Sequence, residues 1–341
     1  MNRKTSKAAI ARRPRIAIDA MGGDGGVATT VAAALELVDL ADLTLVGNAT
    51  DIQGVLPSGS DNISVQHAGE VITPGDTLAD VLRHKPNSSM RQALALHARG
   101  SVDGVVSGGD TGALMALARQ QLHMVPGIER PAILKKIEGI SDTFWMLDLG
   151  ANIDSSPEQL FQFAQMGSLL ASSLGGKPQP RIALLNIGTE RRKGPEVLQK
   201  AAQALADDPD LEYVGFIEAN RLFLNHADVV VCDGFTGNIA LKSMEGAALM
   251  AGHLLKQKLN NTRGIAKFTM GLVRQTFREL RDELNPQQYN GASFVGLNGV
   301  VIKSHGGADA FGFLSALKEA VLEIESEIPE RLAVLFQEES S

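Results

Sequence analysis

Short apolar runs alternate with helical segments along almost the whole chain, and this alternation constrains the fold more than any other feature of the sequence. The runs are continuously apolar, as expected for strands that are covered on both faces. Glycine or a small polar residue follows each run, and a segment with helical spacing comes next. Examples are the strands predicted over Arg15–Met21, Leu43–Gly47, Phe144–Asn152 and Arg181–Thr189. The pattern predicts an α/β protein with a mostly parallel sheet.

The composition is that of an ordinary globular protein. Of the 341 residues, 44% are hydrophobic and 21% are charged, which suits one large domain or two interleaved ones. The net charge of −7, without a basic stripe, argues against nucleic acid as a partner. The single cysteine, Cys232, excludes an internal disulfide and fits a reducing, cytoplasmic compartment. No apolar run reaches membrane-spanning length.

One strand-to-helix motif occurs twice, at an offset of 125 residues counted from Thr111 to Thr236. The first copy, VVSGGDTGALMALA, covers 105–118, and the second, VVVCDGFTGNIALKSMEG, covers 229–246. Glycines at such a turn let a ligand approach the backbone, and the unpaired N–H groups of the helix attract phosphate. We predict that both loops, with NIGTERRKG over 186–194, are walls of one anion-binding cleft. The alternative is that each loop is only a tight turn capped by threonine.

The remaining motifs give no support for a cofactor or a metal ion. Gly23–Ala28 fits the dinucleotide-binding pattern G-x-G-x-x-A, but the second predicted strand ends in Gly47 and Asn48 rather than in an acid. No Walker sequence, metal-ligand spacing or G-x-S-x-G nucleophile turn is present. We therefore expect neither a cofactor nor a metal.

Motifs throughout the chain carry a resemblance to a known family. IAIDAMGGD, NSSMRQAL, GDTGALMALA, LDLGANID, LLNIGTE, KGPEVL, VVVCDGFTGNIALKSMEG and VIKSHG occur in this order. Together they resemble the bacterial phosphate acyltransferases, which are acyl-acyl-carrier-protein:phosphate transacylases. The resemblance implies a three-layer α/β/α fold similar to the isocitrate/isopropylmalate dehydrogenases and the phosphotransacetylases. It also implies a soluble homodimer.

The resemblance further implies a reaction and its partners. A long acyl chain would pass from the thioester of acyl carrier protein to inorganic phosphate, by direct attack of phosphate on the thioester. The acyl phosphate product would go to a membrane glycerol-3-phosphate acyltransferase in phospholipid synthesis. Such an enzyme would be cytoplasmic, with peripheral contact to the membrane surface as an option.

Acyl transfer to phosphate requires a phosphate cradle and hydrogen-bond donors for the developing oxyanion. On the resemblance, we assign this binding to residues of the glycine loops: Gly109, Thr111, Gly112, Gly188, Thr189, Gly234, Thr236, Gly237 and Asn238. We also expect four residues near the first strand to lie in the cleft: Asp19, Gly22, Gly23 and Asp24.

Three residues are candidates for catalysis. Asp233 ends a strand and would take a proton from phosphate or hold a lysine, although such a carboxylate also caps turns. Lys242 would supply positive charge, or it is a solvated surface lysine. His305 follows a strand and would protonate the leaving thiolate. Cys232 is expected to be a buried structural cysteine rather than an acyl-enzyme nucleophile.

Some positions depart from the family pattern and leave rival functions open. Asp110 stands where the family usually has Asn, and its carboxylate would weaken binding of an anion. The rivals are a short-chain phosphotransacetylase that uses a coenzyme A thioester, a non-catalytic scaffold for lipid enzymes, and a nicotinamide-dependent dehydrogenase. Missing ribose-binding and metal-binding acids disfavour the dehydrogenase.

The domain prediction divides the chain into three segments. Residues 1–14 are a basic, disordered extension, 15–330 form one α/β/α catalytic domain, and 331–341 are a flexible tail. Within the domain, 255–290 form a helical protrusion. Its segment Thr262–Leu284 has apolar residues near helical spacing and basic residues elsewhere, so it contacts either a dimer partner or an anionic membrane.

Overall fold

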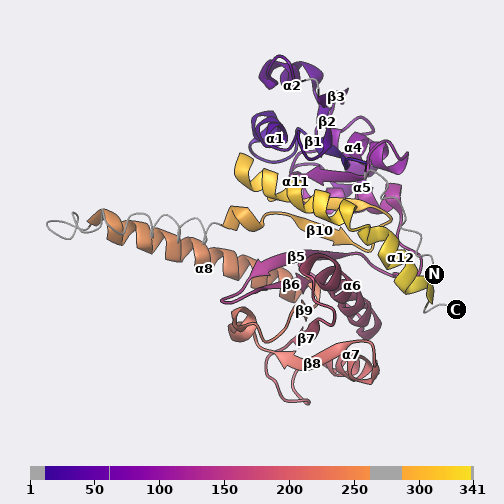
Figure 1. The fold of residues 1–341 in the computed structure, drawn as a ribbon, viewed down its shortest axis with the longest axis vertical. Helices are drawn as coiled ribbons and strands as arrows, with labels where there is room; N and C mark the ends of the chain where they lie inside the picture. Colours follow the sequence, from indigo (N-terminus) through magenta and orange to yellow (C-terminus); the bar gives the residue numbers. More distant parts are fainter. Residues whose placement is uncertain (1–11, 61, 262–285, 339–341) are drawn as a thin grey trace, which may run out of the picture.

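A computed structural model describes residues 12–60, 62–261 and 286–338, which form an 11-stranded sheet between two layers of helices (Figure 1). The strands are β1 (Arg15–Asp19), β2 (Asp42–Gly47), β3 (Ile63–His67), β4 (Gly104–Ser107), β5 (Ala132–Glu138), β6 (Thr143–Leu147), β7 (Arg181–Leu185), β8 (Glu212–Ile217), β9 (Val229–Val231), β10 (Ala292–Val295) and β11 (Val300–Lys303). Their order in the sheet is β3-β2-β1-β4-β11-β10-β5-β6-β9-β7-β8. The predicted α/β class with a mostly parallel sheet is confirmed.

Helices cover both faces of this sheet. The α-helices are α1 (Gly26–Leu35), α2 (Ala49–Val55), α3 (Leu78–Arg83), α4 (Ser89–Ala98), α5 (Thr111–Leu122), α6 (Pro157–Gly175), α7 (Glu196–Asp207), α8 (Gly234–Asn261), α11 (Ala310–Glu325) and α12 (Ile328–Glu338), and the short 3-10 helices are η1 (Ala219–Leu224) and η2 (Pro286–Tyr289). Buried residues of α4, α5 and η1 form the core on one face. On the other face, α1 and α11 cover one half of the sheet, and α6, α7 and α12 cover the other.

The two halves of the sheet run in opposite directions. In one half, β3, β2, β1, β4 and β11 are parallel; in the other, β6, β9, β7 and β8 are parallel. Between them, β10 is antiparallel to both β11 and β5, and β5 is antiparallel to β6. The carboxyl ends of β1, β4 and β11 therefore lie at one edge of the sheet, and those of β6, β7 and β9 lie at the opposite edge.

Two strands, β5 and β10, are not among the predicted ones. In β5 the charged residues Lys135, Lys136 and Glu138 interrupt the apolar run that normally indicates a buried strand. Partners on other elements accommodate the lysines: Lys135 Nζ lies 3.6 Å from Glu245 of α8, and Lys136 Nζ lies 5.4 Å from the ring centre of Trp145 on β6. β10 has only four residues, too few to show a period.

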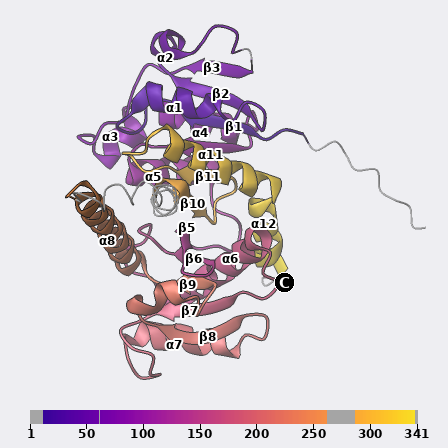
Figure 2. The same cartoon turned by 60° about the vertical axis from the view of Figure 1, so that its left-hand side comes forward.

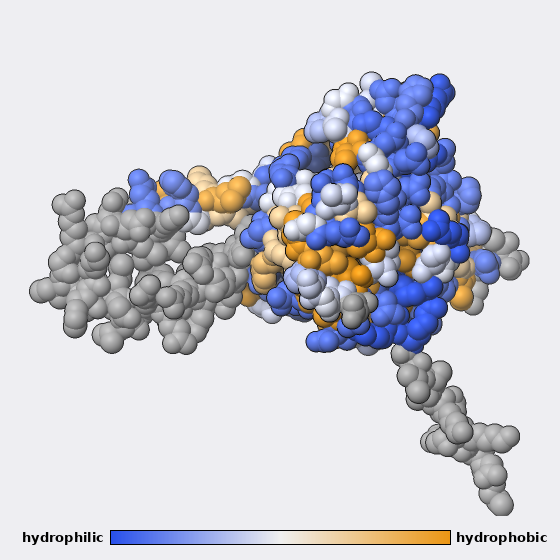
Figure 3. Space-filling model, turned by 90° about the horizontal axis from the view of Figure 1, so that it is seen from above, coloured by the Kyte–Doolittle hydropathy of each residue, from blue (hydrophilic) through white to orange (hydrophobic). Residues whose placement is uncertain are grey.

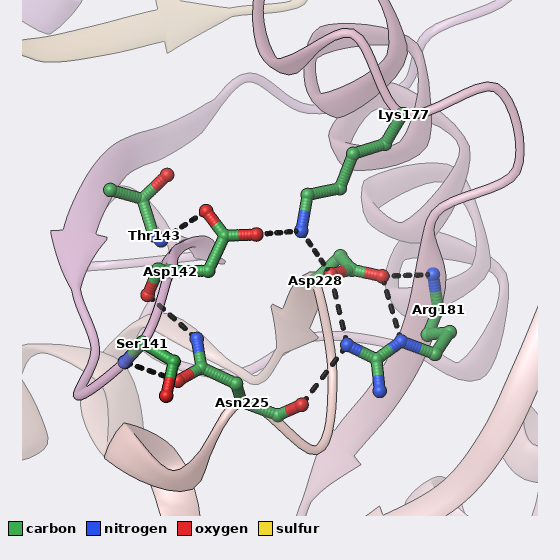
Figure 4. A network of polar contacts seen from close by, with 7 residues as sticks. All are labelled: Ser141, Asp142, Thr143, Lys177, Arg181, Asn225 and Asp228. Carbon is green, nitrogen blue, oxygen red and sulfur yellow. Dashed lines mark hydrogen bonds and ion pairs between the residues drawn. The ribbon is translucent and has the colours of Figure 1, made fainter.

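An Arg–Asp pair holds the amino ends of the strands in each half. In the second half, Asp228 accepts from the backbone N–H and the guanidinium of Arg181, and its other oxygen lies 2.5 Å from Lys177 Nζ (Figure 4). In the first half, Asp103 accepts from the backbone N–H and guanidinium of Arg15 in the same way. Asp228 follows Asp103 by 125 residues, the offset of the two Thr-Gly motifs, so the repeat extends over the whole strand–turn–helix unit.

Helix α8 runs away from the body of the molecule (Figures 1 and 2). Leu249, Met250 and Leu254 on its outer part are exposed, and orange apolar atoms lie along this arm in Figure 3. The long helix predicted after Thr236 is thus confirmed, whereas the segment Thr262–Leu284 lies outside the described residues. None of the described helices is long and apolar enough to cross a membrane.

The predicted flexible tail over 331–341 is wrong as far as Glu338. These residues belong to α12, where Leu332 and Phe336 are buried against the core beside α6. Arg331 of α12 also donates to the Ser173 hydroxyl of α6 over 2.9 Å. The apolar residues four positions apart fit a helix with one covered face.

Candidate active site

Two cavities lie at carboxyl ends of strands, one in each half of the sheet. An apolar cavity of about 1250 Å³ lies beside β6, β7 and β9, and a polar cavity of about 460 Å³ lies beside β1, β4 and β11. Thr236 lines the first, Thr111 lines the second, and no residue lines both. The prediction that both Thr-Gly loops wall one cleft is therefore wrong. Because the halves run in opposite directions, equivalent loops lie at opposite edges of the sheet.

The apolar cavity is bounded mainly by aliphatic and aromatic side chains. One wall is the face of α8 with Phe235, Ile239 and Met244, and other walls come from η1, α7 and the loops after β6 and β7. Ile153 and Ile187, in these loops, are 80% and 77% exposed. Exposed apolar side chains gathered around a cavity are typical of a binding site rather than of an ordinary surface.

Polar groups of the second Thr-Gly loop also line the apolar cavity. Asp233 accepts hydrogen bonds from the Thr236 backbone N–H and from its hydroxyl, both over 2.8 Å. The backbone N–H groups of Gly234 and Gly237 are also occupied: the first donates to Asn152 O and the second to Asp233 O. Asp233 thus caps α8, and the first N–H groups of this helix are not free for phosphate in this structure.

A buried carboxylate that the sequence analysis missed holds this region together. Asp148, fully buried after β6, accepts from the backbone N–H groups of Ile133, Gly150, Ala151 and Asn152. Burial raises the pKa of Asp148, and these hydrogen bonds oppose the rise. The signal was present in the sequence, because LDLG ends a strand in an acid, as the segment over 229–234 does.

The glycines of the second loop are required by packing against Asp148. A Cβ on Gly237 would lie 1.9 Å from Asp148 O, and one on Gly234 would lie 2.3 Å from Asn152 O. Asn238 approaches the same turn, since a Cβ on Gly150 would lie 3.5 Å from the Asn238 Cβ. Gly234 and Gly237 therefore have a structural role whether or not they contact a ligand.

Three strand ends form the polar cavity. Asp24 and Gly23 come from the loop after β1, Gly109, Asp110 and Thr111 from the loop after β4, and Lys303 and Gly306 from the end of β11. The loops pack tightly: Asp24 N–H donates to Gly306 O, and a Cβ on Gly22 would lie 2.7 Å from Gly109 N. Asp19, Gly22, Gly23 and Asp24 therefore lie beside Gly109 and Thr111, and their place in a ligand-binding cleft stays a prediction.

Two buried groups give this cavity its electrostatic character. Asp19 is 1% exposed and accepts from the Ser107 hydroxyl over 2.6 Å, and burial raises the pKa of its carboxyl. Burial lowers the pKa of the Lys303 ammonium to about 8, although the nearby Asp110, Asp19 and Asp24 oppose this shift. The sequence analysis missed Lys303, whose signal is a charge at the end of an apolar strand.

The other predicted residues do not meet in one place. His305 is exposed next to the polar cavity and accepts from the Gly307 N–H, so it lies at the opposite edge of the sheet from Asp233. Lys242 is exposed on α8 and lines neither cavity. Thr189, which follows the buried Gly188, lines a third cavity of about 290 Å³ with Arg221 and His226.

Cys232 packs against the Asp148 backbone and is not accessible. It is 1% exposed, its Sγ lies 3.4 Å from Asp148 O, and burial raises the pKa of its thiol well above the ordinary value. A buried, protonated thiol is a poor nucleophile. Among the described residues, no cluster of three or more His, Cys, Asp or Glu side chains could hold a metal ion.

Solved structures of several other enzymes share this fold. The structure is similar to a phosphotransacetylase from Streptococcus pyogenes, with a TM-score of 0.61 and 18% identity over 92% of this chain and 95% of that one. A branched-chain phosphotransacylase from Enterococcus faecalis is similar with a TM-score of 0.59 and 15% identity, over 91% of this chain and 99% of that one. A 4-hydroxythreonine-4-phosphate dehydrogenase from Klebsiella pneumoniae has the same fold, with a TM-score of 0.54 and 12% identity, over 93% of this chain and 99% of that one.

Sequence comparison then defines the family. Residues 14–331 match the family described as "Fatty acid synthesis protein". The "Phosphate acyltransferase" of Marinobacter nauticus is 45% identical over 320 residues, 93% of this chain and 94% of the relative. That of Alkalilimnicola ehrlichii is 46% identical over 322 residues, 92% of this chain and 93% of the relative. The chain belongs to this family, as its motifs predict, and it is an acyltransferase.

Proposed function

We propose that the protein transfers a long-chain fatty acyl group from acyl carrier protein to inorganic phosphate and so forms acyl phosphate for phospholipid synthesis. The observation that carries this proposal is the apolar cavity. Small-molecule sites usually measure about 300–1,000 Å³, and this cavity of about 1250 Å³ is larger and mostly aliphatic. Such a cavity suits an extended hydrocarbon chain better than a short acyl group.

Direct attack of phosphate on the thioester is the mechanism that these residues favour. A phosphate oxygen attacks the carbonyl carbon, the C–S bond breaks, and the thiolate leaves and takes up a proton. The buried Cys232 is inaccessible for a covalent acyl intermediate. Of the predicted catalytic residues, Asp233 lines the cavity. Together with Thr236, it would position the thioester or the attacking phosphate oxygen.

The proposed partners follow from the chemistry. The acyl donor is acyl carrier protein, and the labile product passes to a membrane glycerol-3-phosphate acyltransferase. Two copies of the chain would form a homodimer in the cytoplasm, with contact to the membrane surface through the arm that begins with α8. The exposed Leu249, Met250 and Leu254 support a contact of this arm with another apolar surface.

A short-chain phosphotransacetylase that uses coenzyme A thioesters is the second candidate, because the fold is shared with such enzymes. The first experiment measures acyl phosphate formed from palmitoyl-acyl carrier protein and from acetyl-coenzyme A, each with inorganic phosphate. The proposal expects turnover with the palmitoyl donor. Turnover with acetyl-coenzyme A alone would establish the rival.

A cavity-filling variant tests where the acyl chain binds. Ala247 lines the apolar cavity, whereas Ala251, one turn further along α8, does not. Ala247→Phe should raise KM for the palmitoyl donor about tenfold and leave an octanoyl donor unaffected, since two displaced methylenes are worth about 1.6 kcal/mol. Ala251→Phe is the matched control and should change neither donor. Equal effects on both chain lengths would place the acyl chain elsewhere.

A further inference from the structure

The apolar cavity is elongated, with a polar end and a far apolar end. Along α8 it is lined by side chains three or four positions apart, from Thr236 to Ala247. This stretch of helix is about 16 Å long at 1.5 Å per residue. Asp233 lies with Thr236 at the polar end, so a chain whose thioester lies there would extend towards Ala247.

Phe223 of η1 lies at the far end of this cavity. Its side chain lines the cavity, and its ring meets the ring of Phe144 edge-on with the two centres 6.3 Å apart. Phe144 is near the amino end of β6, whereas Asp148 follows the carboxyl end and packs against Gly237 in the loop of Thr236. The strand from Phe144 to Asp148 spans about 13 Å. The ring of Phe223 is therefore remote from the polar end and close to the tail of such a chain.

The ring of Phe223 is the bulky group at this end. Ala247 and Ala248, the α8 residues there, are small and leave space beside the helix. Phe235, the other aromatic residue among the described lining residues, precedes Thr236 at the polar end. A ring placed where a hydrocarbon chain ends discriminates chains by length, because each further methylene must find space in a packed wall.

The turn between β5 and β6 holds Phe223 in place. Ile140 N–H, in this turn, donates to Phe223 O over 2.9 Å. The Asn225 side chain donates to Asp142 O over 2.6 Å and accepts from the Ser141 N–H over 3.0 Å (Figure 4). Asn225 has a left-handed backbone with φ of 55°, which Asn tolerates better than most residues. The turn thus fixes the end of η1 and, with it, the position of the Phe223 ring.

We propose that Phe223 sets the maximum length of the acyl chain that the protein accepts, and that Asn225 is a positioning residue that holds Phe223 against the β5–β6 turn. That the apolar cavity is the acyl site rests on the proposed function. A chain whose methyl end stops at the ring binds without strain, whereas a longer chain must displace the ring.

The experiment measures kcat/KM for acyl carrier protein charged with lauroyl, myristoyl, palmitoyl, stearoyl or arachidoyl chains. Phe223→Ala should move the preferred length up by about two carbons and raise the stearoyl-to-palmitoyl ratio about tenfold, the effect of burying two further methylenes. Phe223→Trp should move the preferred length down. Phe311→Ala is the matched control, because this ring of α11 is 51% exposed and lies outside the cavity, and it should leave the ratio unchanged.

A second variant tests the positioning role of Asn225. Asn225→Gly keeps the left-handed backbone and removes both side-chain hydrogen bonds. It should flatten the length preference, because a loosely held ring yields to longer chains. A purely structural role would lower the midpoint of thermal unfolding and leave the ratio between chain lengths unchanged, and that result would overturn the role assigned to Asn225.

Binding of free fatty acids separates chain-length selection from the reaction. Displacement of cis-parinarate, a fluorescent fatty acid, gives the affinities for myristate, palmitate and stearate without carrier protein or phosphate. We expect Phe223→Ala to shift the preferred length in binding as it does in turnover. A shift in binding by a protein without turnover would support the role of Phe223 and refute only the reaction. An unchanged order of chain lengths in folded Phe223→Ala would overturn the role of Phe223, and turnover of the palmitoyl donor would still support the reaction.

Discussion

At the scale of single residues, Lys303 carries a charge where an apolar residue would favour folding. Its ammonium is largely buried without a paired carboxylate, which opposes folding. A protein selected for stability alone would have an apolar residue at the end of β11, where the preceding residues Val300, Val301 and Ile302 are all buried. Residues that lower stability at a cavity are commonly kept for what they bind.

The sign of the pH dependence follows from the pKa of Lys303. It falls from 10.5 to about 8 in the folded protein, so between these values the unfolded chain binds more protons and stability rises with pH. We expect Lys303→Met to raise the free energy of unfolding by about 3 kcal/mol at pH 7, with the gain shrinking as pH approaches 10. Urea unfolding at pH 7 and 9.5 measures this, with Lys318→Met as control. A loss of stability at pH 7 would show that the hydrogen bonds of Lys303 outweigh its burial.

At the scale of elements, the spacing of apolar residues predicted the strands and helices that depend on interactions between residues close in sequence. The strands that end in glycine and the helices that follow them, such as α5 and α8, appear where the apolar periods place them. The charged strand β5 was missed because its lysines depend on partners outside the strand, Glu245 of α8 and Trp145 of the neighbouring strand β6. Helix α12 was missed although its buried residues Ile328, Leu332 and Phe336 lie four positions apart, a helical spacing that was visible in the sequence.

Helix α12 should contribute strongly to stability through Phe336. This side chain is 2% exposed and lies against Gly127, where a Cβ would come within 3.1 Å of Phe336 Cβ. Phe336→Ala should lower the free energy of unfolding by about 3–5 kcal/mol, since it opens a cavity in the core. Val334→Ala, on the same helix but 57% exposed, should cost less than about 0.5 kcal/mol. Similar losses in both variants, measured by urea unfolding, would mean that α12 is not docked as a unit.

At the scale of the whole molecule, the two copies of a repeated unit lie beside two different cavities. The offset of 125 residues relates Asp103 to Asp228 and Thr111 to Thr236. In the first half, Lys303 of β11 pairs in register with Ser107 of β4. In the second half, Leu147 of β6 pairs with Val231 of β9, so Asp148 follows at the position that corresponds to Lys303. A cation and a carboxylate therefore occupy equivalent places in the two halves. The repeat was visible in the sequence, but the separation of its copies was not, because it depends on the antiparallel strands β10 and β5 that reverse the sheet.

The repeated Arg–Asp pairs predict how the two halves respond to acid. Burial raises the pKa of Asp103 and Asp228, but hydrogen bonds from Arg15 and from Arg181 with Lys177 outweigh it and lower both values to about 2. These carboxylates therefore stabilise the protein above their unfolded pKa near 3.8, and this stability is lost as pH falls towards 2. Asp228→Asn and Asp103→Asn should each cost about 2 kcal/mol at pH 7.

Because the two pairs lie in separate halves, their effects on global unfolding should add. The double variant should lose the sum of the two single losses at pH 7, and its difference from the parent protein should shrink steadily below pH 4. Urea unfolding monitored by circular dichroism between pH 3 and 7 measures both expectations. If the double variant instead shows two separate transitions, the halves unfold independently, and the continuous sheet through β10 and β5 does not couple them into one cooperative unit.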